Sequence, residues 1–147
     1  MTFISVDGVL KQLRRRDVLT LGQPEFDVLS PASFAVRQVT RGVSILLPDE
    51  NGGYYSRFNA ISCIGQTTAA RNALAALSEA LRDTTAPNRI ELAAGDVVVL
   101  DNWRSLGMRS AFSPRWDGRD RWMVRMYAAP SRQAGVPQSE ETPRLWQ

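Results

Sequence analysis

Two stretches carry apolar residues at the spacing of an amphipathic helix. Residues 4–20 form the first, with Ser5 as a plausible N-cap and the Arg14–Arg16 run expected as a solvated, cation-rich C-terminal end. Ala69–Arg82 forms the second and more regular one, capped by Thr67 or Thr68, with Glu79 and Arg82 facing outward. The apolar positions are Val6, Val9, Leu10 and Leu13 in the first helix and Ala70, Ala73, Leu74, Leu77 and Leu81 in the second.

Shorter runs of β-branched, aromatic and alternating residues predict strands. Those between residues 34 and 64 read as an antiparallel meander that turns at Asn51–Gly53, where consecutive glycines tolerate left-handed backbone. Residues 24–33 are rich in turn formers and predict a connecting segment. The runs Val97–Leu100 and Trp122–Tyr127 are expected as buried or half-buried strands. The predicted strands are Phe34–Val39, Gly42–Leu47, Tyr54–Ile61, Arg89–Leu92, Val97–Leu100 and Trp122–Tyr127.

Length and composition indicate one ordinary soluble domain. The chain has 147 residues, of which 44% are apolar and 22% charged. We expect the domain to span residues 1–130 and the polar, proline-bearing segment 131–147 to be a largely disordered tail. No apolar run is long enough to cross a membrane, and residues 1–10 do not resemble a secretory signal. Cys63 is the single cysteine and is expected as a small buried strand residue. Because one cysteine cannot form an intramolecular disulfide, a reducing, cytoplasmic location is favoured.

Charge and histidine content exclude several function classes. The net charge of +3 and the pI of about 9.6 come from scattered arginines, with Lys11 the only lysine, and no nucleic-acid reader motif is present. We therefore expect neither a nucleic-acid nor a membrane partner. The chain contains no histidine. It cannot by itself assemble a 2-His-1-carboxylate iron site, a His-ligated zinc site, or a Ser–His or Cys–His nucleophile pair.

The segment between the last two predicted strands has the densest charge. Residues 101–121 hold five arginines and three carboxylates, which are costly to bury unless they are paired or face an anion. Arg121 and Arg125 lie four apart in a predicted strand and share a face, as bidentate recognition of carboxylates requires. The alternative is structural pairing with Asp96, Asp101, Asp117 or Asp120. The neighbouring tryptophans, expected mainly in packing, are Trp103, Trp116 and Trp122.

Three motifs in this part of the chain occur in a fixed order. They are Gly95-Asp96 followed by an apolar strand and Asp101-Asn102, then Arg109-Ser-Ala-Phe-Ser-Pro-Arg115, then Asp117-Gly-Arg-Asp-Arg121-Trp122. This order resembles the end of the Fe(II)/2-oxoglutarate dioxygenases of the clavaminate synthase and taurine dioxygenase-like superfamily, particularly its arginine and asparagine hydroxylases. The resemblance covers roughly residues 4–128. It implies an α+β fold in which this chain supplies about the C-terminal half of a double-stranded β-helix (jelly roll), with one or two flanking helices.

The resemblance also implies roles for single positions. The last iron-ligating histidine of the family corresponds to Gly107, so that metal ligand is lost. Arg121 corresponds to the arginine that binds the far carboxylate of 2-oxoglutarate, Arg125 would lie near cofactor or substrate, and Arg109 would support the ligand loop. Asp101 and Asn102 are expected to shape that loop by hydrogen bonds. We expect no cofactor for the isolated chain, although 2-oxoglutarate or a similar carboxylate is a possible ligand. Fe(II) is expected to bind only if a partner supplies ligands.

These observations favour a degenerate relative of the dioxygenases that has no iron site of its own. It would act as a partner or small-molecule-binding subunit in a biosynthetic pathway. Half a jelly roll exposes sheet edges, which require a lid, a dimer mate or a heteromeric protein partner.

Two alternatives stay open. The first is a metal-independent enzyme of cyclase or isomerase type on a carboxylate-bearing small molecule, with Asp101, Asp117 or Tyr127 as acid–base groups. The second is one half of a split 2-oxoglutarate-dependent oxygenase whose partner brings the histidines. Activity of an Arg121→Ala variant would argue against the first, and iron-dependent turnover on mixing with a partner would support the second.

Overall fold

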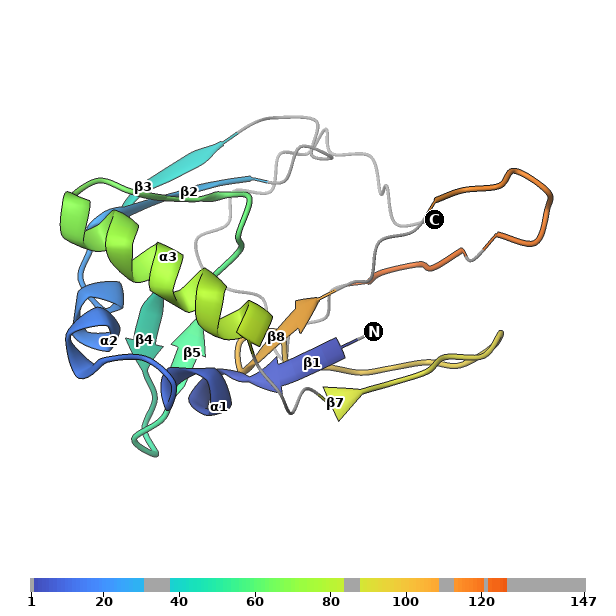
Figure 1. Cartoon of the computed structure of the whole chain (residues 1–147), viewed down its shortest axis with the longest axis horizontal. Coiled ribbons are helices and arrows are strands. Elements are labelled where there is room, and N and C mark those ends of the chain that lie inside the picture. Colours follow the sequence, from blue (N-terminus) through green and yellow to red (C-terminus); the bar gives the residue numbers. More distant parts are fainter. Residues whose placement is uncertain (1, 31–37, 84–87, 109–112, 121, 127–147) are drawn as a thin grey trace, which may run out of the picture. The chain divides into compact units, whose positions relative to one another are not determined.

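The computed structural model describes residues 2–30, 38–83, 88–108, 113–120 and 122–126 (Figure 1). The chain divides into two compact units, Met1–Ala111 and Phe112–Gln147, each described by itself below. The helices and strands of the described residues all lie in the first unit. They are β1 (Thr2–Ser5), α1 (Val6–Leu10), α2 (Arg15–Leu21), β2 (Phe26–Leu29), β3 (Val39–Val43), β4 (Leu46–Pro48), β5 (Tyr54–Ser56), β6 (Cys63–Gly65), α3 (Thr68–Asp83), β7 (Asn88–Arg89) and β8 (Ser105–Met108).

The described strands form three small antiparallel sheets. Their orders are β7-β1-β8, β3-β2-β6 and β4-β5. In the first sheet, β1 pairs residue by residue with β8, so that Phe3 lies opposite Gly107 and Ile4 opposite Leu106. This mixed architecture of antiparallel sheets and helices agrees with the predicted α+β class. Three helices are present in the described residues, where one or two were expected.

Helix α3 organises the core. The Thr67 hydroxyl accepts the Ala70 N–H at 3.0 Å and caps the helix, as its sequence predicts. The helix packs against α1, α2 and β6. Figure 1 shows α1 and α2 beside it. Glu79 and Arg82 are exposed, so the prediction of an amphipathic helix over 69–82 is confirmed. The buried apolar residues of the core are Ile4, Val6, Val9, Leu10, Leu21, Phe26, Ile45, Leu46, Ala70, Ala73, Leu77, Ala80, Leu81 and Leu106.

The prediction of one helix over residues 4–20 is wrong. Ser5 does cap a helix, since its hydroxyl accepts the Gly8 N–H at 3.0 Å, but this helix ends at Leu10. The preceding residues pair with β8 as β1, and Leu13 packs against the core from a turn. Arg15 and Arg16 begin α2 and do not end a helix. The periodic pattern therefore reports burial correctly, while strand pairing and the turn at residues 11–14 set the boundaries.

The meander prediction is correct only at its hairpin. Strands β4 and β5 pair around Asn51–Gly53, where Gly52 has φ +80°. Strand β2 lies in the segment predicted as a connection, and it separates β3 from β6 by pairing with both. The run 42–47 is divided between β3, which ends at Val43, and β4, which begins at Leu46, and the run 54–61 ends as a strand at Ser56. Residues 34–37 lie outside the described residues.

The two apolar runs near the charged segment also differ from their prediction. Neither 97–100 nor 122–126 is a strand. Strand β7 spans Asn88–Arg89 and so includes only Arg89 of the strand predicted at 89–92. Val97 and Val99 are 86% and 91% exposed, and Trp122 is 91% exposed. No described strand pairs with either run, so β propensity alone does not bury them. The predicted tail 131–147 lies outside the described residues.

Candidate functional site

A hydrogen-bonded turn leads into β8 and sets the direction of the strand that carries Gly107. The Asp101 carboxylate accepts the N–H groups of Trp103 at 2.9 Å and Arg104 at 3.2 Å. Its backbone carbonyl accepts both the N–H and the hydroxyl of Ser105. Asp101 thus shapes this loop, as expected for an aspartate at the end of an apolar run.

Arg104 connects this turn to the β4–β5 hairpin through an ion pair with a buried carboxylate. Its Nη2 lies 2.6 Å from Oδ2 of Asp49, whose side chain is only 1% exposed. The other carboxylate oxygen, Oδ1, accepts the N–H groups of Asn51 at 2.8 Å and Gly53 at 2.7 Å. The Arg104 guanidinium also lies over the Tyr55 ring, 4.7 Å from its centroid, and donates to the Tyr55 hydroxyl at 3.2 Å. We call Asp49, Tyr55 and Arg104 the ionic cluster.

The ionic cluster keeps both of its charges at neutral pH. Burial by itself raises the pKa of Asp49, but the N–H groups of Gly53 and Asn51 and the positive charge of Arg104 outweigh it, and the pKa lies below its ordinary value. The hydrogen bond to Tyr55 and the charge of Asp49 raise the pKa of Arg104 despite burial. Arg104 therefore stays charged while it pairs with Asp49 and Tyr55.

An open, mainly apolar hollow lies beside this turn. It has a volume of about 430 Å³, and Asp101 and Arg104 contribute polar atoms to its lining. Its apolar wall comes from β1 and from the segments that flank residues 91–98. The apolar residues of the wall are Phe3, Ile4, Ile90, Val99 and Leu100. A hollow of this composition suits apolar groups better than a small dicarboxylate.

The second unit contains a loop built on Asp120. Its carboxylate accepts the N–H groups of Arg115 at 2.9 Å and Trp116 at 2.7 Å, and this holds Trp116 in the left-handed region with φ +58°. Asp117 accepts the Arg119 N–H at 2.9 Å and lies 3.5 Å from Nε of Arg115. Both carboxylates therefore take part in loop hydrogen bonds and in pairing with Arg115.

The described part of the structure does not bring the remaining predicted site residues together. Arg109, Arg121 and Tyr127 lie outside them. Arg125 lies exposed in the second unit, and Gly107 lies in β8. The predicted roles of these residues, and the acid–base roles of Asp101 and Asp117, stay predictions.

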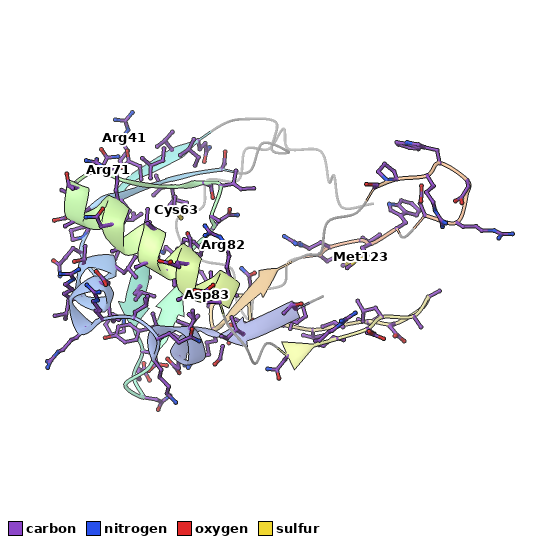
Figure 2. All side chains as sticks on the ribbon, in the orientation of Figure 1. Arg41, Cys63, Arg71, Arg82, Asp83 and Met123 are labelled. Atoms are coloured by element: carbon purple, nitrogen blue, oxygen red, sulfur yellow. The ribbon has the colours of Figure 1, made fainter. Side chains whose placement is uncertain are left out.

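Cys63 is a packing residue of β6 (labelled in Figure 2). Its Sγ lies 3.3 Å from the Asn59 nitrogen, whose N–H it accepts. Burial raises the pKa of the thiol, with a smaller opposing effect of the Asn59 N–H. A neutral, half-buried thiol is a poor nucleophile and a poor metal ligand.

The ionic cluster is not among the sites predicted from the sequence. One signal is present in the sequence. Asp49 lies two residues before Asn51 and four before Gly53, and an aspartate at this spacing is typical of a turn in which the carboxylate accepts backbone N–H groups. Nothing in the sequence links Asp49 to Arg104, since they lie in segments that only the fold brings together.

Comparison with known proteins identifies relatives of this chain. It is 49% identical over 57 residues to clavaminate synthase 2 of Streptomyces clavuligerus, a match that covers 39% of this chain and 17% of that protein. It is 29% identical over 122 residues to the L-asparagine oxygenase of Streptomyces coelicolor, covering 83% of this chain and 36% of that protein. The chain thus corresponds to well under half the length of these relatives.

Among solved structures, the chain resembles an asparagine oxygenase in complex with Fe(II), 2S,3S-3-hydroxyasparagine and succinate. The TM-score is 0.72 at 30% identity, and the match covers 82% of this chain and 37% of that one. In the described parts of the present chain, no helix is long and apolar enough to cross a bilayer. Residues 37–127 match the Taurine catabolism dioxygenase TauD, TfdA family, and the chain belongs to this family.

Proposed function

We propose that this chain is a TauD-family unit that holds no iron of its own and acts as a binding subunit beside another polypeptide. Its fold would be part of a double-stranded β-helix, and its ligand a small carboxylate such as 2-oxoglutarate. The observation that carries the proposal is the donor set, because the residues present do not fit the Fe(II) that the solved relative binds.

Iron of this family's kind requires nitrogen and carboxylate ligands gathered at one point. The chain has no histidine, and the described residues hold no group of three or more Cys, Asp or Glu side chains placed to bind a metal. By resemblance, the last ligand position is Gly107, which has no side chain. The carboxylates of Asp49 and Asp101 already accept backbone N–H groups, and Asp49 also pairs with Arg104.

The exposed apolar runs support a polypeptide partner. Val97 and Val99 carry strong β propensity but stand 86% and 91% exposed, and none of the described strands pairs with them. Such a segment is a template for strand addition. The matched region makes up 37% of the solved relative. A polypeptide supplying such strands is the proposed partner.

The test for iron is an anaerobic titration with Fe(II) and 2-oxoglutarate, followed by the visible metal-to-ligand charge-transfer band. We expect no saturable band from the folded chain, while the asparagine oxygenase that has been solved with Fe(II), run in parallel, should give one. A saturable band of one equivalent from this chain would overturn the proposal.

The test for the ligand is calorimetric titration with 2-oxoglutarate in the absence of metal. We expect saturable binding that Arg121→Ala abolishes, because a guanidinium is the natural partner of a carboxylate. Arg82→Ala is the matched control, since this arginine is exposed at the end of α3 (Figure 2). Equal binding by both variants would remove Arg121 from the site, and no binding by the unaltered chain would leave the partner role alone.

A further inference from the structure

Phe3 and Gly107 form a directly opposed pair across the antiparallel strands β1 and β8. Directly opposed residues in such a pair project from the same face of the sheet. The Phe3 side chain is buried, with 7% of the residue exposed. Any side chain at position 107 would therefore project toward the face that Phe3 already covers.

The space above Gly107 is filled by the Phe3 ring. A Cβ atom added to Gly107 would lie 3.2 Å from Cε1 and 3.3 Å from Cδ1 of that ring. Carbon atoms in good contact are about 3.5–4.0 Å apart, so even one methyl group requires the ring to move. An aromatic side chain lying across a strand glycine is a known way of covering the gap that the glycine leaves.

We infer that Phe3 has taken the place of the side chain at position 107. The position that the resemblance assigns to a metal ligand is thus closed by apolar cross-strand packing and is not an open site that lacks only its histidine. This inference deepens the proposed function, on which its meaning rests. It predicts that a histidine restored at 107 would compete with Phe3 for the same space.

The test is a double-mutant cycle of Gly107→Ala and Phe3→Val, read as urea-unfolding midpoints of the metal-free protein. Valine keeps the strand preference of position 3 but lacks the ring atoms that touch Gly107. In the unaltered background, Gly107→Ala should lower the midpoint. In the Phe3→Val background it should raise the midpoint, because alanine loses less backbone freedom than glycine in a strand.

Ile4→Val is the matched control, because Ile4 is the next residue of β1 and pairs with Leu106. Gly107→Ala should still lower the midpoint in that background. Gly107→His should lower it more than Gly107→Ala does, and Phe3→Val should recover part of the loss. If Gly107→Ala changed the unfolding midpoint equally in the unaltered and Phe3→Val backgrounds, the inference would be overturned. The outcome is separable from the iron titration, because a charge-transfer band would overturn the proposed function while leaving this cycle intact.

Discussion

Helix α3 and the run 97–100 are two apolar stretches of the first unit that lie in opposite environments. Ala70, Ala73 and Leu77 of α3 are fully buried, whereas Val97 and Val99 are 86% and 91% exposed. A helix satisfies its backbone hydrogen bonds internally and needs only one covered face. A strand needs a neighbour for its backbone as well as a cover for its side chains. Apolar side chains are therefore sufficient to bury helix α3 but insufficient to bury the run 97–100, which has no paired strand among the described residues.

Leu77→Ala should give the largest effect and sharpen this comparison. Leu77 is fully buried between α3 and the rest of the core, and its truncation leaves a cavity. We expect a loss of about 2–5 kcal/mol in unfolding free energy, measured by urea denaturation. Val99→Ala, which removes exposed apolar atoms, should change it by no more than about 0.5 kcal/mol. Equal losses would mean that the run 97–100 is covered in solution.

Gly65→Ala should give the next largest effect. A Cβ on Gly65 would lie 2.6 Å from the Arg71 nitrogen and 2.7 Å from the Ala70 carbonyl carbon, both backbone atoms of α3. Because backbone cannot give way as a flexible side chain can, we expect a loss of about 1–3 kcal/mol in the same measurement. Gly95→Ala is the contrast. A Cβ built on Gly95 would have no heavy atom within 4 Å other than those of the adjacent residues, although the φ of +93° adds local strain. A neutral Gly65→Ala would show that β6 and α3 are not closely packed.

The ionic cluster predicts how stability depends on pH. The pKa of Asp49 is lower in the folded chain than its unfolded value of about 3.9. Its contribution is therefore complete above that unfolded value and is lost as the pH falls through the folded pKa. Asp49→Asn should lower the unfolding midpoint at pH 7 and flatten its decline in acid. Parallel acid profiles for both proteins would show that other carboxylates control the decline.

Val97→Thr/Val99→Thr should have the smallest effect on stability. Threonine keeps the β-branched shape but replaces an apolar methyl group with a hydroxyl, and neither side chain is covered. We expect unfolding free energy to change by no more than about 0.5 kcal/mol. The fluorescence of a dye that binds exposed apolar surface, and any self-association seen by sedimentation, should both fall. Unchanged dye binding would place the exposed apolar surface elsewhere.

The contrast between the two regions also explains which features sequence reasoning could find. The cap at Thr67, the stripe of α3 and the turn at Asn51–Gly53 depend on residues close together in the chain, and local chemistry determines them. The pairing of β2 with both β3 and β6 depends on segments up to tens of residues apart, and so does the contact of Asp49 with Arg104. No local pattern encodes such partners. The family motifs pointed to Gly107 but not to Phe3, because the two strands meet only in the fold.

The contact between Phe3 and Gly107 has an evolutionary consequence. A histidine codon arising first at position 107 would place its side chain against the ring, since even a Cβ there lies 3.2 Å from it. A smaller residue arising first at position 3 would give up buried aromatic packing before any benefit existed. We expect either single step to lower the free energy of unfolding, so this pair opposes the introduction of a side chain at this strand position.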